Sequence, residues 1–141
     1  MTREALAELF TQLNEAANRH DADAVAQAYA ENSVVESPIG GGAVVGRKAQ
    51  AQVLHALFRG IPDVTFAVDE MLIDGNRVAQ VGWFRGTDTG NFMGLPSTGK
   101  PFNLPIVVLS TIEDGLIVRE RRIYDFTALL VQLGLLKAKP V

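Results

Sequence analysis

The carboxylate of Asp125 is the first candidate for chemistry, because it ends a strand-like segment, 116–126, that is rich in apolar and aromatic residues. A carboxylate in such surroundings must be paired, cap a helix or act chemically. Asp125 can be the N-cap of a final helix, the partner of Arg121 or Arg85 in a buried ion pair, or a general acid/base in a pocket. The local sequence leaves these three roles open.

Aromatic and apolar residues offer a binding surface for a flat apolar ligand. Trp83 lies in a strand-like segment, and Phe92, Met93 and Leu95 lie in a long loop, 86–101. Such residues pack in a core at least as readily as they line a ligand site, so both roles stay open. Long loops in compact domains are often lids, and we expect this loop to form a mobile rim.

Two segments nearly match the phosphate-binding loop pattern, and neither completes it. The segment 41–46 has the glycine spacing, but Arg47-Lys48-Ala49 follows it, so the lysine is displaced and the hydroxyl that binds magnesium is missing. The segment 94–100 ends in a lysine, yet Pro101 replaces the required Ser or Thr and no helix is predicted there. We therefore do not expect a nucleotide.

Metal and nucleophile chemistry lack their usual residues. His20 and His55 are the two histidines, and no carboxylate is spaced to share a metal with either. No cysteine is present, and Ser37, Ser97 and Ser110 have no histidine base in a recognisable pattern. We expect no metal and no serine or cysteine nucleophile.

Composition sets further limits on partners and compartment. The 141 residues are 48% hydrophobic, which is enough for one domain with a buried core, and a net charge of -3 with scattered Lys and Arg disfavours nucleic acid. No apolar run approaches the roughly 20 residues that span a bilayer, and the N-terminus lacks the order of a signal peptide. With no cysteine, the chain suits a reducing cytoplasm, where we expect it.

The elements that position these residues follow from apolar spacing, caps and turn signals. Helical spacing and N-cap residues predict three helices before any long strand, and two Asp-Gly turns predict two hairpins after them. The predicted elements are helices at 2–19, 21–32 and 47–60, a short strand that begins at 34–35 and stops at Pro38, hairpins at 64–73 with 77–85 and 102–113 with 116–126, and a final helix ending near 134. Helices first and hairpins afterwards indicate an α+β fold with an antiparallel sheet.

The turn of the last hairpin predicts which side chains share a face of the sheet. With 114–115 as a two-residue turn, one face carries Leu104, Ile106, Val108, Arg121, Ile123 and Asp125. The other face carries Pro105, Val107, Leu109, Arg122 and Tyr124. Because both faces carry apolar residues, we expect helices to cover one and a second subunit to cover the other, which predicts a homodimer.

Four segments, read in order, resemble the SnoaL-like polyketide cyclase family. They are GTDTGNFMGLPSTGKP at 86–101, EDG at 113–115, RIYD at 122–125 and LLVQLG at 129–134. The resemblance implies one domain over 1–141 with the nuclear transport factor 2-like fold, in which a cone-shaped, curved antiparallel sheet covered by helices surrounds an apolar pocket.

The resemblance also implies an activity and its residues. In this family an aspartate on the last long strand is the acid/base of an intramolecular aldol ring closure without a cofactor, and Asp125 matches that position. The hypothesis is a cofactor-independent, cyclase-like enzyme for a hydrophobic, carbonyl-bearing small molecule, with Asp125 and Arg121 as catalytic residues. Its substrate-binding residues are Leu13, Glu36, Trp83, Phe92, Met93, Leu104, Ile106 and Ile123.

Three other functions stay open within this superfamily. A non-catalytic domain would bind an apolar molecule and use Asp125 only as a helix cap. A ketosteroid isomerase would need an aspartate and a tyrosine where this sequence has Ser37 and Leu13. A limonene epoxide hydrolase activates water with an Asp-Arg-Asp set, of which Asp125 with Arg121 or Arg85 would supply part. The place of Asp125, in the pocket or at the helix cap, separates enzyme from binder.

Overall fold

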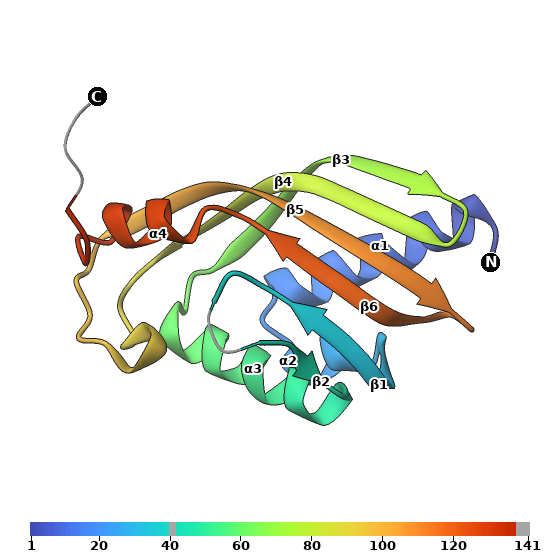
Figure 1. Cartoon of the computed structure of the whole chain (residues 1–141), viewed down its shortest axis with the longest axis horizontal. Helices are drawn as coiled ribbons and strands as arrows, with labels where there is room; N and C mark the ends of the chain where they lie inside the picture. The colour runs from blue at the N-terminus through green and yellow to red at the C-terminus, as the bar shows by residue number, and fades with distance from the viewer. Residues whose placement is uncertain (40–41, 138–141) are drawn as a thin grey trace.

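The computed structural model describes residues 1–39 and 42–137 and has an α+β architecture, as predicted. Its six strands form one sheet in the order β2-β1-β6-β5-β4-β3, in which only the β1–β6 pair of the described strands is parallel. Figure 1 shows β3 to β6 arching over α1, α2 and α3, with α4 beyond the end of β6. The elements are α1 (Arg3–Asn18), α2 (Ala22–Ala26), β1 (Tyr29–Glu36), β2 (Val44–Val45), α3 (Arg47–Gly60), β3 (Thr65–Asp74), β4 (Arg77–Thr87), η1 (Phe92–Gly94), β5 (Pro101–Glu113), β6 (Leu116–Ile123) and α4 (Phe126–Gln132).

Side-chain caps begin three of these helices. Thr2 caps α1, Asp21 caps α2 and Asp125 caps α4, each by accepting a hydrogen bond from a backbone N–H in the first turn. Such a cap stabilises a helix by about 1 kcal/mol. Helix α3 instead begins after Gly46, which has a φ of 97° and offers no side-chain cap. The sequence placed α1 and α3 correctly because both carry a continuous helical pattern with clear ends.

The second helix is shorter than the sequence predicts. A helix over 21–32 is wrong beyond Ala26, because the chain extends into β1 from Tyr29 onward. Tyr29 pairs in parallel with Ile117 of β6, and the Ile117 N–H donates a hydrogen bond to the carbonyl of Ala28 at 2.8 Å. Pairing with a strand distant in the sequence overrides the local helical spacing. Tyr29 is therefore a strand residue, and only 2% of its surface is exposed.

A β-bulge in β6 interrupts the pairing of the last hairpin. Next to the turn, Ile112 pairs with Ile117. The following pair joins Thr111 to Arg119, so β6 contains one extra residue, Val118. Because side chains alternate between the two faces of a sheet, one extra residue moves every later side chain of that strand to the opposite face.

The bulge reverses the faces predicted for the end of β6. Glu120, Arg122 and Tyr124 point to the side that the helices cover, where Ile106 and Val108 also lie. Arg121 and Ile123 point to the outer side instead, and 49% of Ile123 is exposed. The prediction that Arg121 and Ile123 share a face with Ile106 is therefore wrong.

Two clusters of buried side chains hold the helices against the sheet. The first, toward α1 and α2, includes Leu6, Phe10, Val25, Val78 and Ile117. The second, toward α4, includes Ile61, Phe102, Leu104, Leu129 and Leu133. Each fully buried side chain of this size contributes about 1.5–3 kcal/mol relative to an exposed one. Residues of both clusters reach a cavity between the sheet and the helices.

The outer face of the sheet remains partly exposed. It carries Val81, Trp83, Pro105, Val107, Leu109 and Ile123, and the Trp83 indole N–H donates to the Asp69 carboxylate at 3.0 Å. The Arg85 guanidinium lies 5.8 Å from the centre of the Trp83 ring. Within residues 1–39 and 42–137, no helix is both long enough and apolar enough to cross a membrane.

Candidate active site

A cavity of about 420 Å³ lies between the concave face of the sheet and the helices. Its walls are mainly apolar and come from α1, α3, the long strands and the loop before β5. Among them are Leu13, Leu57, Phe66, Phe84, Ile106 and Val108. Concave apolar sites of this size suit small organic molecules, which a few placed polar groups then orient.

A connected group of three polar side chains lies in this cavity: Glu120, Arg122 and Tyr29. The Tyr29 hydroxyl donates to Glu120 Oε1 at 2.8 Å, and Arg122 Nε donates to Glu120 Oε2 at 2.7 Å. A longer contact of 3.5 Å joins Arg122 Nη2 to the Tyr29 hydroxyl oxygen. The Glu120 side chain is 3% exposed and that of Arg122 is 20% exposed, so the pair is largely withdrawn from water. We call these three residues the buried triad.

The backbone fixes the buried triad from two neighbouring strands. Glu120 and Arg122 are alternate residues of β6 and therefore share a face. Tyr29 begins β1, which runs parallel to β6. Arg47 in the first turn of α3 donates through Nε to the Tyr29 carbonyl at 2.8 Å. The triad is thus held by strand pairing and by a tie to α3, not by a loop.

The buried environment sets the charges in the triad. Burial, reinforced by the negative charge of Glu120, raises the pKa of Tyr29 above its ordinary range. Burial alone would lower the pKa of Arg122, but its interactions with Glu120 and Tyr29 together outweigh burial and raise the pKa above the usual value. At neutral pH Tyr29 therefore keeps its proton and Arg122 stays cationic.

Tyr124 adds a hydroxyl to the same wall. It follows Arg122 by two residues, lines the cavity, and its ring centre lies 5.9 Å from that of Phe84. Burial raises its pKa to about 12, although the positive charge of Arg122 acts in the opposite direction. Tyr124 is consequently a neutral hydrogen-bond donor at neutral pH.

Asp125 lies outside the cavity, at the N-cap of α4. Its Oδ1 accepts a hydrogen bond from the Ala128 N–H at 2.9 Å, and the residue is exposed. Its predicted partner Arg121 points outward and lies 3.8 Å from a carboxylate oxygen of Glu36. The expectation of Asp125 and Arg121 together in the pocket is therefore wrong. The bulge at Val118 is the physical reason, because it turns these residues away from the interior.

Half of the predicted substrate-binding residues reach the cavity. Leu13, Phe92, Met93 and Ile106 line it. The other four do not. Glu36 pairs with Arg119 at 2.8 Å on the surface, Trp83 and Ile123 lie on the outer face, and Leu104 is 1% exposed in the second core cluster.

The sequence reasoning missed Glu120, Arg122 and Tyr29. A signal for the first two exists, since Glu120, Arg122 and Tyr124 are alternate residues and share a face in any register. The alternative set, Arg121, Ile123 and Asp125, has the same spacing. Which set faces inward depends on whether the strand contains an extra residue before it. Residue propensities do not predict such a bulge.

The described residues contain no group of three or more His, Cys, Asp or Glu side chains able to hold a metal ion. Ser37 and Leu13, where an isomerase would carry its aspartate and tyrosine, both line the cavity. The chemistry of a ketosteroid isomerase or of an Asp-Arg-Asp hydrolase is therefore not assembled from the residues predicted for it.

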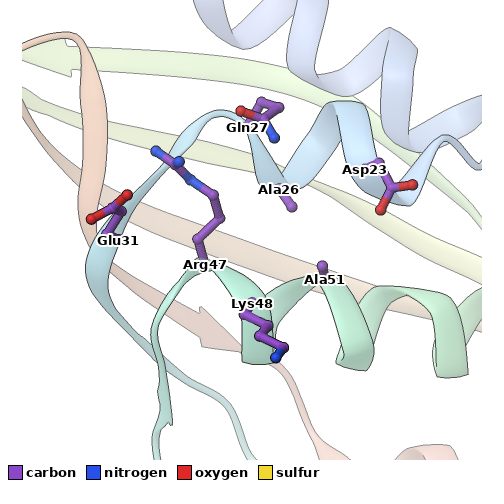
Figure 2. A pocket seen from close by; sticks show the side chains of 7 residues that line it. All are labelled: Asp23, Ala26, Gln27, Glu31, Arg47, Lys48 and Ala51. Atoms are coloured by element: carbon purple, nitrogen blue, oxygen red, sulfur yellow. The ribbon is translucent and has the colours of Figure 1, made fainter.

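A second depression lies on the surface between α2, β1 and the start of α3. Figure 2 shows Glu31, Arg47 and Lys48 toward one end of it and Asp23 toward the other, so charges of both signs line it. This mixture does not select an anion. Residue 41 of the near-match to a phosphate loop lies outside the described residues, and 42–46 lead into α3 without a side-chain cap.

Comparison with known proteins identifies the class of the molecule. Residues 7–133 match the family model described as SnoaL-like polyketide cyclase. The chain therefore belongs to the SnoaL-like polyketide cyclase family. No curated protein matches it.

Solved structures share the fold. IdmH from Streptomyces antibioticus, inferred to be a polyketide cyclase, is 29% identical, with 91% of this chain and 97% of that chain covered and a TM-score of 0.76. A protein from Xanthomonas campestris pv. campestris, also inferred to be a polyketide cyclase, is 25% identical, with coverage of 93% and 98% and a TM-score of 0.84.

A third structure names the fold. A hypothetical protein from Catenulispora acidiphila, described as having the ketosteroid isomerase-like fold, is 19% identical, with coverage of 91% and 93% and a TM-score of 0.79. The fold predicted from the sequence, a curved sheet covered by helices around an apolar cavity, is confirmed.

Proposed function

We propose that this protein is a cofactor-independent enzyme that catalyses acid/base chemistry, of the aldol-cyclisation type, on a hydrophobic, carbonyl-bearing small molecule. One observation carries the proposal. Among the described residues that line the cavity, Glu120 is the one carboxylate and Arg122 the one cation, and they are in contact at 2.7 Å. A base beside a fixed positive charge in an apolar cavity is what enolate formation requires.

The first chemical step follows from these two side chains. Glu120 removes a proton from the carbon beside a substrate carbonyl, and the electron pair of that C–H bond moves into an enolate. Arg122 uses its Nε and one Nη2 contact within the triad, so its remaining N–H groups are available for the enolate oxygen. The Tyr124 hydroxyl lines the same wall as a second donor.

The second step returns the proton and closes the ring. The enolate carbon attacks a second carbonyl of the same molecule, which forms a C–C bond and an alkoxide. The protonated Glu120 then gives its proton to the alkoxide, so the product is an isomer of the substrate and the enzyme is restored. Neither an oxidant nor a cofactor enters this balance. The Tyr29 hydroxyl keeps Glu120 oriented through the 2.8 Å hydrogen bond.

A matched pair of carboxylate-to-amide variants tests the proposal. Glu120→Gln keeps an oxygen that accepts from Tyr29, but it removes the base, and we expect turnover of polyketide-like keto esters to fall roughly a hundredfold or more. Asp125→Asn is the control, because asparagine caps a helix nearly as well as aspartate, and we expect turnover to be unchanged. Melting temperatures establish that both variants fold. Unchanged turnover in folded Glu120→Gln would refute the proposal.

A second candidate function is ligand binding without catalysis. The observation that favours it is that both carboxylate oxygens of Glu120 already accept hydrogen bonds, as in a structural ion pair. Under this function the cavity holds an apolar molecule, and Arg122 anchors one of its oxygens. Binding of keto esters without turnover by the wild-type protein would favour this second function.

We also propose that the protein is a cytoplasmic homodimer whose copies meet through the outer face of the sheet. The support is the partly exposed apolar set on that face, with Ile123 at 49% exposure. A copy of the same face brings its own apolar residues to the contact. Light scattering should give twice the chain mass at micromolar concentration, and Ile123→Glu should give the monomer. A wild-type monomer at every concentration would exclude the dimer.

A further inference from the structure

A second polar pair lies in the cavity, apart from the buried triad. Asn14 of α1 and Gln80 of β4 both line the cavity, and Asn14 Nδ2 donates to Gln80 Oε1 at 2.6 Å. Gln80 is 2% exposed. Burying two amides costs free energy unless their groups find partners, so the pair needs a reason to be there.

The pair is only half satisfied by its internal hydrogen bond. Within residues 1–39 and 42–137, no hydrogen bond reaches the Gln80 Nε2 or the Asn14 Oδ1. Reversing both amides exchanges the roles of the two side chains but again leaves one whole NH2 group and one carbonyl oxygen free. The pair therefore offers a donor and an acceptor side by side, which matches a hydroxyl group and also accepts a carbonyl oxygen.

An asparagine with a purely structural role lies one turn further along α1. Asn18 donates to the Phe66 carbonyl at 3.0 Å and accepts from the Phe66 N–H at 2.9 Å, so it uses both amide groups to tie α1 to β3. Asn14 lies on the same face of the helix, but among the described residues its side chain makes a single hydrogen bond, to another side chain. Asn18 uses both of its amide groups in hydrogen bonds, whereas Asn14 uses one. This contrast points to a ligand at Asn14.

Strand pairing fixes the separation between this pair and the triad. Gln80 of β4 and Arg122 of β6 both lie opposite Val108 of β5. Neighbouring strands are about 4.8 Å apart, so the two Cα atoms are separated by about 10 Å across the concave face. Apolar side chains, Val108 among them, line the wall between them.

We infer that Asn14 and Gln80 form a specificity site that binds a hydroxyl or carbonyl oxygen of the substrate at the end remote from the reacting carbonyl. The inference rests on the proposed function, which places the reacting carbonyl at Arg122. The ligand is then a flat, fused-ring or ring-forming molecule with oxygen atoms at both ends and an apolar middle. A molecule with one oxygen uses the triad alone and binds more weakly.

Two aromatic probes that differ by one hydroxyl test the inference by calorimetric titration. The probes are 2-naphthol and 2,6-dihydroxynaphthalene. In the wild-type protein we expect the diol to bind about tenfold more tightly, which is the usual value of one buried hydrogen bond. In Gln80→Met, which keeps the size of the side chain and removes its amide, the difference should fall below about twofold. The control Gln12→Met changes an exposed residue of α1 and should behave as wild type.

Each outcome has a definite meaning. Equal affinity of the two probes for the wild-type protein, or an unchanged difference in Gln80→Met, overturns the inference and leaves the proposed function intact. Failure of both probes to bind the wild-type protein overturns the inference and the proposed function together. If Gln80→Met does not fold, Asn14→Leu at the half-buried position in α1 gives the same readout.

Discussion

Glu120 and Asp125 lie five positions apart in the chain and have opposite environments. Glu120 lies in the cavity and binds Tyr29 and Arg122. Asp125 lies in solvent and binds the backbone N–H of Ala128. Both carboxylates accept hydrogen bonds, but only the first lies where a substrate can bind. The burial of a carboxylate and its hydrogen-bond partners therefore decide whether it can act on a substrate. Its residue type, or its match to a position in the family sequence pattern, is not sufficient.

The difference between them originates in one backbone irregularity. Without the extra residue Val118, the alternation along β6 would place Arg121, Ile123 and Asp125 toward the interior. With it, Glu120 and Arg122 face the cavity. A bulge beside a candidate site that re-aims its side chains is a recurrent feature of β-sheets.

The largest effect on stability should follow from removing the buried carboxylate. Glu120→Ala leaves the Arg122 cation and the Tyr29 hydroxyl without their partner, and we expect a loss of roughly 3–5 kcal/mol in the free energy of unfolding. Asp125→Ala removes only a helix cap and should cost about 1 kcal/mol. Urea unfolding of the two variants measures both values. Equal losses of unfolding free energy in the two variants would contradict the different environments assigned to Glu120 and Asp125.

The next effect concerns the two tyrosines of the chain, Tyr29 and Tyr124, both of which line the cavity. Because burial raises both pKa values, the folded protein should show no tyrosinate absorbance near pH 10, and Tyr124 should ionise only near its pKa of about 12. Because the pKa of Tyr124 is higher in the folded state, its contribution to the free energy of unfolding is complete below the ordinary tyrosine pKa of 10.0. That contribution is lost as the pH rises through about 12. Ionisation of both residues near pH 10 in folded protein would contradict a buried site.

The smallest effect belongs to a third carboxylate, Glu36, which bonds Arg119 at 2.8 Å on the surface. Its side chain is 41% exposed and that of Arg119 is 60% exposed. Exposed pairs of this kind contribute little, so Glu36→Gln should change the free energy of unfolding by less than about 1 kcal/mol and leave turnover unchanged. Urea unfolding and a turnover assay check this. A large loss of stability or turnover in Glu36→Gln would show that burial does not determine how much each of these three carboxylates contributes.

Local pattern was sufficient for much of the fold. The helical spacing of α1 and α3, the Asp-Gly turns of the two hairpins and the capping role of Asp125, one of three left open, are each encoded within a few residues. Such signals do not depend on the rest of the chain. For that reason they predict elements and caps reliably.

The site depended on contacts that no local pattern contains. Tyr29 leaves a helical pattern because β1 pairs with β6, and Glu120 faces inward because β6 contains a bulge. Both events are set by tertiary packing, which overrides propensity. The sequence therefore predicted the cavity and half of the named wall residues, but the carboxylate that lines the cavity is Glu120 and not Asp125.

The most direct test of the central role of Glu120 is its ability to remove a proton from carbon. Nuclear magnetic resonance can follow deuterium exchange at the carbon beside the carbonyl of 2-tetralone in D₂O, without knowledge of the natural substrate. The wild-type protein and Asp125→Asn should accelerate the exchange equally, and Glu120→Gln should lose roughly a hundredfold or more of that acceleration. Exchange that survives in Glu120→Gln but is lost in Asp125→Asn would contradict the assignment and return the role to Asp125.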